Sequence, residues 1–204
     1  MSYPGWMLLR VARRIPRTES EGPGARYALW VQGCSIRCEG CCNPEMFSDR
    51  GGEEVDVAAL AREVLDEPGL EGLSILGGEP FEQAGPLAEL ASLVREGGLS
   101  VMVFSGFVRE ELEARADPHA LALLAAADLL ADGPFVASQP GSRWRWLGSQ
   151  NQRMHFLSER YTPEDARFYG DNTVDIRLVD GRLEISGWAP AVKCLGIERL
   201  RRRG

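Results

Sequence analysis

The sequence predicts an α/β fold: a parallel sheet arranged as a partial (β/α) barrel, covered by helices and followed by a C-terminal β-hairpin extension. Short apolar runs recur up to residue 131, and helical patterns separate them. A later stretch alternates in polarity on both sides of Asp180-Gly181. Strands separated by single helices form βαβ units with parallel strands. An Asp-Gly pair between alternating runs is a strong signal for a two-residue hairpin turn.

The expected strands of the sheet are short. The first, residues 6–14, has mixed polarity and precedes a loop over 18–26. The next four are apolar runs, as expected for strands buried on both faces. They span residues 28–31, 73–76, 99–104 and 129–131. Each run ends near Gly, Ser or Asp, which are common loop residues.

Helical patterns fill the intervals between these strands, and the hairpin comes last. Helices are expected over residues 55–65, 83–96, 110–116 and 118–126, and hairpin strands over 173–179 and 182–186. We expect the hairpin to pack on the main sheet. The chain therefore divides into a catalytic domain over residues 6–153 and an extension over 154–204, which carries the hairpin and a basic tail.

Candidate functional loops follow four of the predicted strands. A cysteine loop follows the run 28–31, Gly77-Gly78-Glu79-Pro80 follows 73–76, Ser105-Gly106 follows 99–104 and Asp132-Gly133 follows 129–131. Ligands of parallel sheets bind at the carboxyl ends of the strands. We therefore expect these four loops to converge on one edge of the sheet.

Composition narrows the class of protein. The 204 residues carry a formal charge of −7 and a pI near 5.0, which argues against a general nucleic-acid binder. No apolar run approaches the roughly 20 residues that span a bilayer, and the start lacks a signal-peptide pattern. We expect a cytoplasmic protein without a membrane partner. Four of the five cysteines lie within residues 34–42, which indicates a metal site rather than a disulfide framework.

The cysteines Cys34, Cys38 and Cys41 have C-x3-C-x2-C spacing. Three thiolates on one loop can hold three corners of a [4Fe-4S] cluster and leave its fourth iron open to a small molecule. Two alternatives remain. A zinc site needs four ligands, and the fourth would come from Cys42, Cys194, His119 or His155. A four-cysteine electron carrier would use Cys194 as its last ligand.

The run from Gly33 to Cys41, followed by Asn43-Pro44-Glu45, resembles the cluster loop of radical S-adenosylmethionine (SAM) enzymes. More narrowly, it is similar to the activating proteins of anaerobic ribonucleotide reductase and to related glycyl-radical-enzyme activases. Those activases usually have Tyr where this chain has Cys42, which we expect to be a spare buried thiol. The resemblance extends in the same order through Gly22-Pro23-Gly24, Gly77-Gly78-Glu79-Pro80, Phe104-Ser105-Gly106-Phe107, Leu130-Ala131-Asp132-Gly133-Pro134-Phe135 and Gly148-Ser149-Gln150-Asn151-Gln152.

This resemblance implies a [4Fe-4S] cluster on Cys34, Cys38 and Cys41, and SAM as the second cofactor. The cluster would cleave SAM reductively to a 5′-deoxyadenosyl radical that abstracts a hydrogen atom. By the same likeness, the backbone of Gly40, Cys41 and Cys42 reads the adenine edge.

The predicted SAM site extends over three further loops. Gly77 and Gly78 let the backbone approach the SAM ammonium group without a Cβ, and Glu79 adds a carboxylate acceptor. By family likeness Ser105 lies near the ribose or the methionine carboxylate. Asp132 is expected to face the same cavity. The element Asn151-Gln152-Arg153 resembles one that lines or closes the site, although solvent-facing polar residues are the competing interpretation.

The expected partners are a glycyl radical enzyme, whose glycine α-hydrogen is the best substrate hypothesis, and a low-potential electron donor of flavodoxin or ferredoxin type. An anaerobic ribonucleotide reductase is the nearest example of such a partner. One rival is a radical SAM enzyme that modifies a small molecule or peptide, since the extension could cover the cavity. The rival from another class is a non-catalytic iron-sulfur or zinc module.

Overall fold

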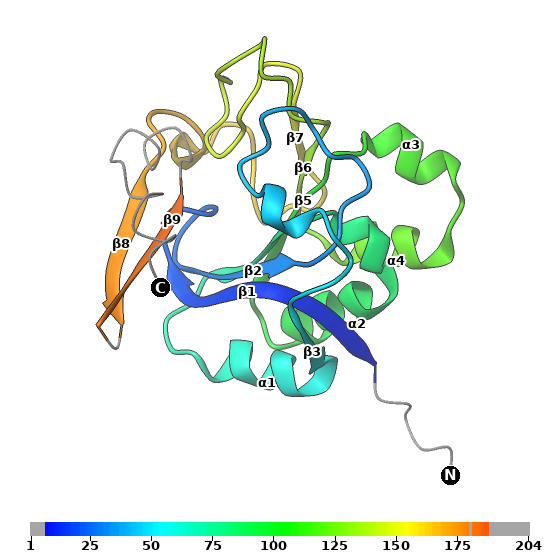
Figure 1. The fold of residues 1–204 in the computed structure, drawn as a ribbon, viewed down its shortest axis with the longest axis vertical. Coiled ribbons are helices and arrows are strands. Elements are labelled where there is room, and N and C mark those ends of the chain that lie inside the picture. Colours follow the sequence, from blue (N-terminus) through cyan, green and yellow to red (C-terminus); the bar gives the residue numbers. More distant parts are fainter. Residues whose placement is uncertain (1–6, 180, 188–204) are drawn as a thin grey trace.

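In a computed structural model the chain forms a seven-stranded sheet in the order β3-β1-β2-β4-β5-β6-β7, and residues 7–179 and 181–187 are described (Figure 1). The central strands β2, β4, β5 and β6 are parallel, whereas β1, β3 and β7 join as antiparallel strands. The strands are β1 (Leu8–Thr18), β2 (Arg26–Val31), β3 (Glu53–Asp56), β4 (Gly72–Gly77), β5 (Ser100–Phe104), β6 (Leu129–Asp132) and β7 (Arg153–Phe156).

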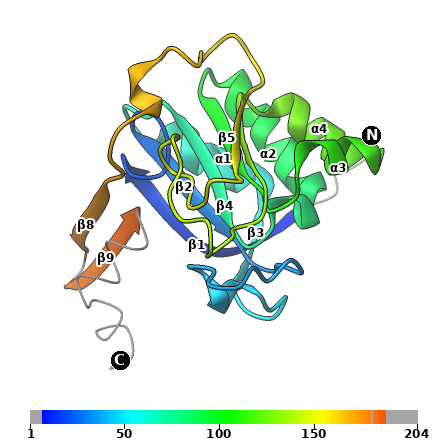
Figure 2. The same cartoon turned by 90° about the horizontal axis from the view of Figure 1, so that it is seen from above.

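Helices cover one face of this sheet, and an irregular segment covers part of the other (Figure 2). The helices are α1 (Val57–Asp66), α2 (Ala84–Glu96), α3 (Arg109–Ala114) and α4 (Pro118–Ala126), with 3-10 turns η1 (Pro44–Met46), η2 (Pro80–Gln83) and η3 (Ala166–Phe168). Leu73 and Ile75 of β4 point to the helical side, where they join the main core. Met102 and Leu129 join a second core with Trp144 and Phe168 on the opposite side.

The α/β class and the four central strands are confirmed. The expected first strand is longer than predicted and ends at Thr18, and Trp6 lies outside the described residues. The edge strands β3 and β7 were not expected. Val55 was expected to lie in a helix, but in the structure it belongs to β3 and pairs with Leu9 of β1. The polar sequence of β3 does not predict a strand. This strand forms because the edge of β1 offers free backbone hydrogen-bonding groups.

The predicted hairpin is present as β8 (Val174–Val179) and β9 (Arg182–Gly187), with Leu178 opposite Leu183. It forms a separate two-stranded sheet and does not extend the main one (Figure 1). The hairpin attaches to β1 and to the loop after it: Arg13 donates to the Ile185 carbonyl at 2.6 Å, and the Glu19 N–H donates to the Asp175 carboxylate at 2.8 Å. The hairpin therefore lies against the edge of the main sheet at this loop.

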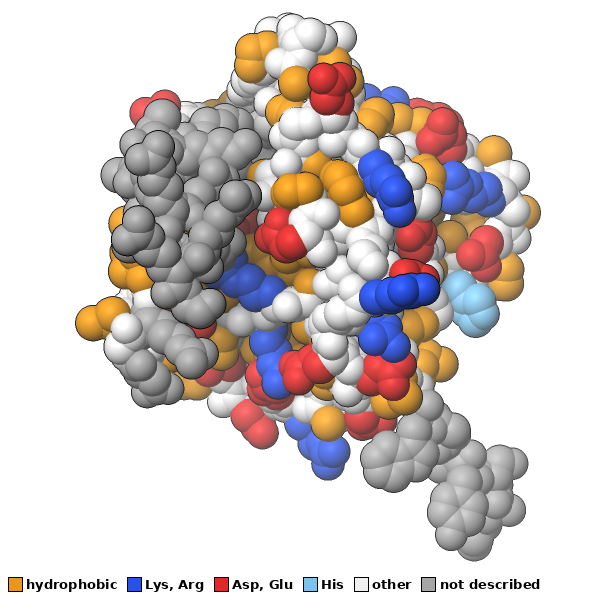
Figure 3. Space-filling view, viewed as in Figure 1, with side chains coloured by type: hydrophobic (Ala, Val, Ile, Leu, Met, Phe, Trp, Pro, Cys, Tyr) orange, Lys and Arg blue, Asp and Glu red, His pale blue; other side chains and the backbone are white. Residues whose placement is uncertain are grey.

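The predicted domain boundary at residue 153 falls at the first residue of β7, which pairs with β6 in the main sheet. The division of the chain into two parts stays a prediction. Cys194 and the basic tail lie outside the described residues. None of the described helices is long and apolar enough to cross a membrane. On the face shown in Figure 3, basic and acidic side chains are interspersed.

Candidate functional site

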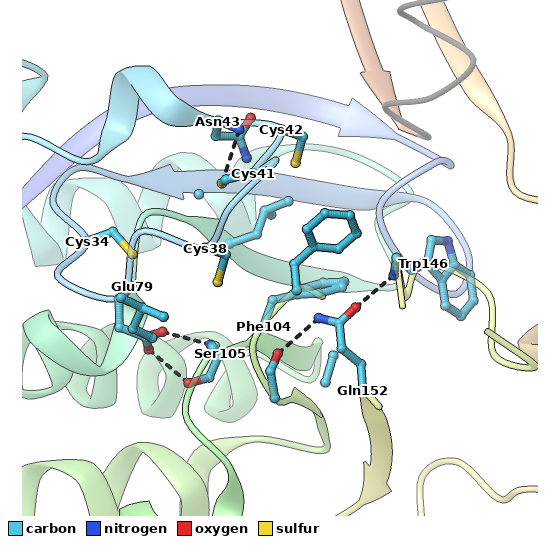
Figure 4. Close-up of a pocket in the computed structure, with 18 of the residues that line it drawn as sticks. Cys34, Cys38, Cys41, Cys42, Asn43, Glu79, Phe104, Ser105, Trp146 and Gln152 are labelled. Atoms are coloured by element: carbon cyan, nitrogen blue, oxygen red, sulfur yellow. Dashed lines mark hydrogen bonds between the residues drawn. The ribbon is translucent and has the colours of Figure 1, made fainter. Parts of the chain in front are cut away.

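Four loops at the carboxyl ends of the parallel strands meet around one cavity of about 400 Å³ (Figure 4). They are the loops that the sequence singles out after β2, β4, β5 and β6. Most of the predicted site residues line the cavity, namely Cys34, Cys38, Gly40, Cys41, Cys42, Gly77, Gly78, Glu79 and Ser105. The convergence that was expected from strand order is therefore present.

The cysteine loop is held by backbone contacts at both ends. The Gly33 N–H donates to the Met46 carbonyl at 3.0 Å, and the Cys41 N–H donates to the Cys38 carbonyl at 3.2 Å. The Asn43 N–H donates to Cys41 Sγ at 3.4 Å, as expected for a thiolate that carries negative charge (Figure 4). Gly40 has φ +76°, a left-handed conformation that a side chain would strain.

The donor set fits an iron-sulfur cluster better than a single zinc ion. Within the described residues, no three His, Cys, Asp or Glu side chains lie close enough together to hold one metal ion. In a [4Fe-4S] cluster each cysteine binds a different iron, so the thiolates stand farther apart than around zinc. Cys34, Cys38 and Cys41 all border the cavity, and His119 and His155 do not.

Cys42 is exposed, so the expectation of a buried thiol was wrong. It lies at the outer turn of the cysteine loop, where the chain turns back toward η1, and its side chain borders the cavity (Figure 4). Its predicted backbone contact with adenine stays a prediction.

The glycines after β4 pack against the base of the cysteine loop. A Cβ on Gly78 would lie 2.1 Å from the Gly33 carbonyl oxygen, and one on Gly77, which has φ +107°, would lie 2.7 Å from Trp30 Cα. The Glu79 N–H donates to the same Gly33 carbonyl at 2.8 Å. The sequence argument assigned these glycines to the approach of a ligand. Their nearest neighbour in the structure is the protein's own backbone, and both still border the cavity.

Glu79 is a buried carboxylate that joins the loops after β4 and β5. It accepts hydrogen bonds from the Ser105 hydroxyl at 2.9 Å, the Gly106 N–H at 2.8 Å and the Phe81 N–H at 2.9 Å (Figure 4). Burial raises the pKa of Glu79 to about 7, although these three hydrogen bonds oppose the rise. Ser105 also accepts from the Phe107 N–H at 3.0 Å, so its hydroxyl shapes the turn as well as facing the cavity.

The raised pKa of Glu79 predicts a pH dependence of stability. Between pH about 4.5 and 7 the folded protein keeps a proton at Glu79 that the unfolded chain has released, so the free energy of unfolding falls as pH rises through this window. A shift of this size corresponds to at most about 3 kcal/mol. Glu79→Gln is therefore expected to make the profile less steep in urea unfolding of the cluster-free protein, with Glu21 contributing the remaining slope, whereas the exposed Glu45→Gln leaves the profile unchanged. A profile for Glu79→Gln as steep as that of the native chain contradicts the assignment.

Asp132 is fully buried and does not border the cavity. Its carboxylate accepts from the Arg109 N–H at 2.7 Å and from Arg153 at 2.5 Å, and His155 Nε2 lies 2.9 Å from it. Burial alone would raise the pKa of Asp132, but the neighbouring His155, Arg153 and Arg109 N–H outweigh it and lower the pKa. Asp132 thus ties β6 to β7 and α3. The structure does not bring it to the site where the sequence argument placed it.

Other residues that border the cavity come from segments with weak or no sequence signal. Gln152 clamps the loop after β6: it accepts from the Gly148 N–H at 2.8 Å and donates to the Gly133 carbonyl at 3.1 Å. It borders the cavity, whereas a solvent-facing position was the favoured expectation. Glu21 accepts from the Gly187 N–H at 2.6 Å, and burial raises the pKa of Glu21 to about 7. No local pattern predicts this contact, because its two members lie 166 positions apart.

Together, the fold and the three-cysteine loop indicate an iron-sulfur protein. Residues 20–155 match the family of 4Fe-4S single cluster domains, so the predicted [4Fe-4S] cluster is confirmed. The chain belongs to the family of anaerobic ribonucleoside-triphosphate reductase-activating proteins, since it is 32% identical to the one from Vibrio cholerae over 142 residues, 66% of this chain and 89% of that protein. The counterpart from Enterobacteria phage T4 is 28% identical over 139 residues, 65% of this chain and 85% of that protein.

Further matches are shorter or more distant. The pyruvate formate-lyase-activating enzyme of Listeria monocytogenes is 33% identical over 91 residues, 42% of this chain and 36% of that enzyme. Among solved structures, QueE from Escherichia coli covers 50% of this chain and 55% of its own, with 18% identity and a TM-score of 0.40. The sequence-based predictions of an enzyme, of radical SAM chemistry and of SAM as cofactor are confirmed by the family.

Proposed function

We propose that this enzyme activates a glycyl radical enzyme of the anaerobic ribonucleotide reductase kind by removing a hydrogen atom from a glycine of that partner. The observation that carries the proposal is the meeting of the three-cysteine loop with Gly77-Gly78-Glu79 around one cavity. We further propose that the electron donor is a low-potential flavodoxin or ferredoxin. The enzyme would work in the reducing cytoplasm, because cluster thiols must stay reduced.

The chain's own residues prepare this cavity for radical chemistry. Cys34, Cys38 and Cys41 would hold the cluster, which would supply the one electron that cleaves SAM to methionine and a 5′-deoxyadenosyl radical. Gly77, Gly78 and Glu79 form the wall that adjoins the base of the cysteine loop and would orient the SAM ammonium group. Apolar side chains complete the lining and exclude water from a reactive intermediate, which prevents side reactions. They include Ile36, Leu76, Phe104 and Phe135.

Anaerobic reconstitution followed by assay with the partner tests this proposal. We expect about four irons per chain, release of 5′-deoxyadenosine from SAM under a strong reductant, and a glycyl radical signal in electron paramagnetic resonance when a glycyl radical protein encoded nearby is added. A chain that binds zinc and cleaves no SAM contradicts the proposal. A chain that cleaves SAM but gives no radical on that partner contradicts the partner alone.

A second candidate, modification of a peptide or small molecule, is favoured by one observation. Asn172 and Gly187 border the cavity, and both lie beyond the residues 20–155 that match the family. The extension therefore narrows one side of the cavity. Release of 5′-deoxyadenosine that is stimulated by a small molecule, and not by a glycyl radical protein, would favour this function.

A further inference from the structure

Two neighbouring side chains, one of which borders the cavity, each have a buried hydrogen-bond donor without an acceptor. Trp146 borders the cavity, and its indole nitrogen Nε1 is buried with no hydrogen-bond partner. The Nε of the adjacent Arg145 is also buried and has no partner. A buried donor without an acceptor costs about 1–3 kcal/mol and is rare in native proteins. Two in succession, one of them on a side chain that borders the cavity, indicate that the acceptor belongs to a ligand.

The missing acceptor should be negatively charged. The Arg145 guanidinium lies 4.8 Å from the centre of the Trp146 ring, and within the described part of the chain no carboxylate pairs with it. Its other contacts are long: 3.4 Å to the Arg167 carbonyl and 3.5 Å to the Thr173 hydroxyl. By contrast, Arg153 and Arg167 each pair with two carboxylates. A half-buried cation without a counter-charge favours an anionic ligand.

The backbone holds this pair in a strained position. Trp146 has φ +67°, which is unusual for a bulky residue and persists only where the surroundings enforce it. Its N–H donates to Asn172 Oδ1 at 2.6 Å, and the Arg145 N–H donates to the Phe168 carbonyl at 3.0 Å. The Phe168 ring also contacts the Trp146 ring edge to face, with centroids 5.6 Å apart.

Asn172 and Phe168 both lie beyond the residues that match the family. Arg145 and Trp146 themselves lie within the matched residues, and contacts from the extension hold them in place.

We propose that Arg145 and Trp146 bind an oxyanion, a carboxylate or phosphate group of the molecule that enters the cavity. The guanidinium supplies a charge-assisted hydrogen bond and the indole a second donor. Solvent does not reach Arg145 Nε or Trp146 Nε1, so the two side chains have to move apart slightly to admit the oxyanion. The long hydrogen bonds of Arg145 permit this movement. The oxyanion can come from an acidic side chain of a polypeptide or from a phosphorylated small molecule. This site follows from the unpaired donors and does not depend on the identity of the activated partner.

Nuclear magnetic resonance of the indole groups tests this site in the reconstituted full chain. Trp146→Phe assigns the Trp146 Nε1–H signal, and acetate and inorganic phosphate serve as probes for the two sources. We expect one or both to move that signal downfield and to saturate. Arg145→Gln should weaken the binding about tenfold or more, since it removes a charged hydrogen bond. Arg145→Lys should still bind the anion, although more weakly than the native chain. The conclusion therefore does not rest on one variant alone.

The chain offers a matched control in the preceding Arg-Trp pair. Arg143 lies 4.5 Å from the centre of the Trp144 ring, and the Trp144 ring does not border this cavity. Arg143→Gln should leave the titration unchanged. Saturation by acetate alone assigns the site to an acidic side chain, and saturation by phosphate alone assigns it to a phosphorylated ligand. An indole signal that neither anion moves, or equal binding by the native chain and Arg145→Gln, overturns the proposal.

Discussion

Replacement of Cys34, Cys38 or Cys41 by Ala is expected to abolish cluster assembly and with it all cleavage of SAM. In the proposed ligand set each thiolate would hold one corner of the cluster, and within the described residues no other cysteine besides Cys42 borders the cavity to replace a lost ligand. A cluster with only two protein ligands is also more exposed to solvent and to loss of iron. Iron content, the brown cluster absorption and 5′-deoxyadenosine release after anaerobic reconstitution measure the effect.

The controls for this series are the other two cysteines. Cys42→Ala should keep both cluster and cleavage, because Cys42 adjoins Cys41, and neighbouring residues rarely direct both side chains to one cluster. Cys194→Ala should keep the cluster as well. Loss of the cluster in Cys194→Ala would instead support a four-cysteine electron carrier. Retention of four irons in Cys38→Ala would contradict the ligand set itself.

The central part of the fold could be predicted from sequence because it depends on local patterns. The runs at 73–76 and 99–104 are uninterrupted and apolar, and the observed strands β4 and β5 are buried along most of their lengths. Burial on both faces leaves only apolar residues acceptable, so the pattern is unambiguous. The order of the loops then followed from the rule that parallel strands place their carboxyl ends at one edge.

The edge strands could not be predicted, because their identity depends on the partner rather than on their own residues. Glu53 and Glu54 of β3 are exposed and polar, and they form a strand only because β1 offers free backbone groups beside them. From sequence, Arg153 was assigned to an element that lines or closes the site, and His155 was considered as a possible zinc ligand. In the structure their side chains meet Asp132 across the β6-β7 pair.

In the candidate site, too, local sequence patterns were informative, whereas contacts between distant segments could not be predicted. The spacing of Cys34, Cys38 and Cys41 predicted them as cluster ligands, and the structure places all three at the cavity. Asp132 was misplaced, because alternation along a four-residue strand does not reveal that Arg153 and His155 of β7 lie against its carboxylate. Contacts such as that of Glu21 with Gly187 join segments far apart in sequence, and no local pattern records them.

Gly78→Ala is the second substitution with a large expected effect. The added Cβ would lie 2.1 Å from the Gly33 carbonyl oxygen and 3.0 Å from that of Val31, so backbone atoms have to move rather than a flexible side chain. Because Gly78 does not have a left-handed φ, a loss of stability in Gly78→Ala reports the steric clash of the added Cβ and not backbone strain. We expect a loss of about 3 kcal/mol or more in the free energy of unfolding. Because Gly33 begins the cysteine loop, iron incorporation should fall together with stability.

Gly85→Ala is the matched control for Gly78→Ala. Gly85 lies in the first turn of α2, and a Cβ there would meet only His119 at 3.5 Å, an ordinary contact. Alanine favours a helix over glycine by up to about 1 kcal/mol, so this variant should be neutral or slightly more stable. Urea unfolding and iron content after reconstitution compare the two variants. If Gly78→Ala matched Gly85→Ala in both measurements, the close contact between the β4 loop and the cysteine loop would not be what holds the cluster loop in place.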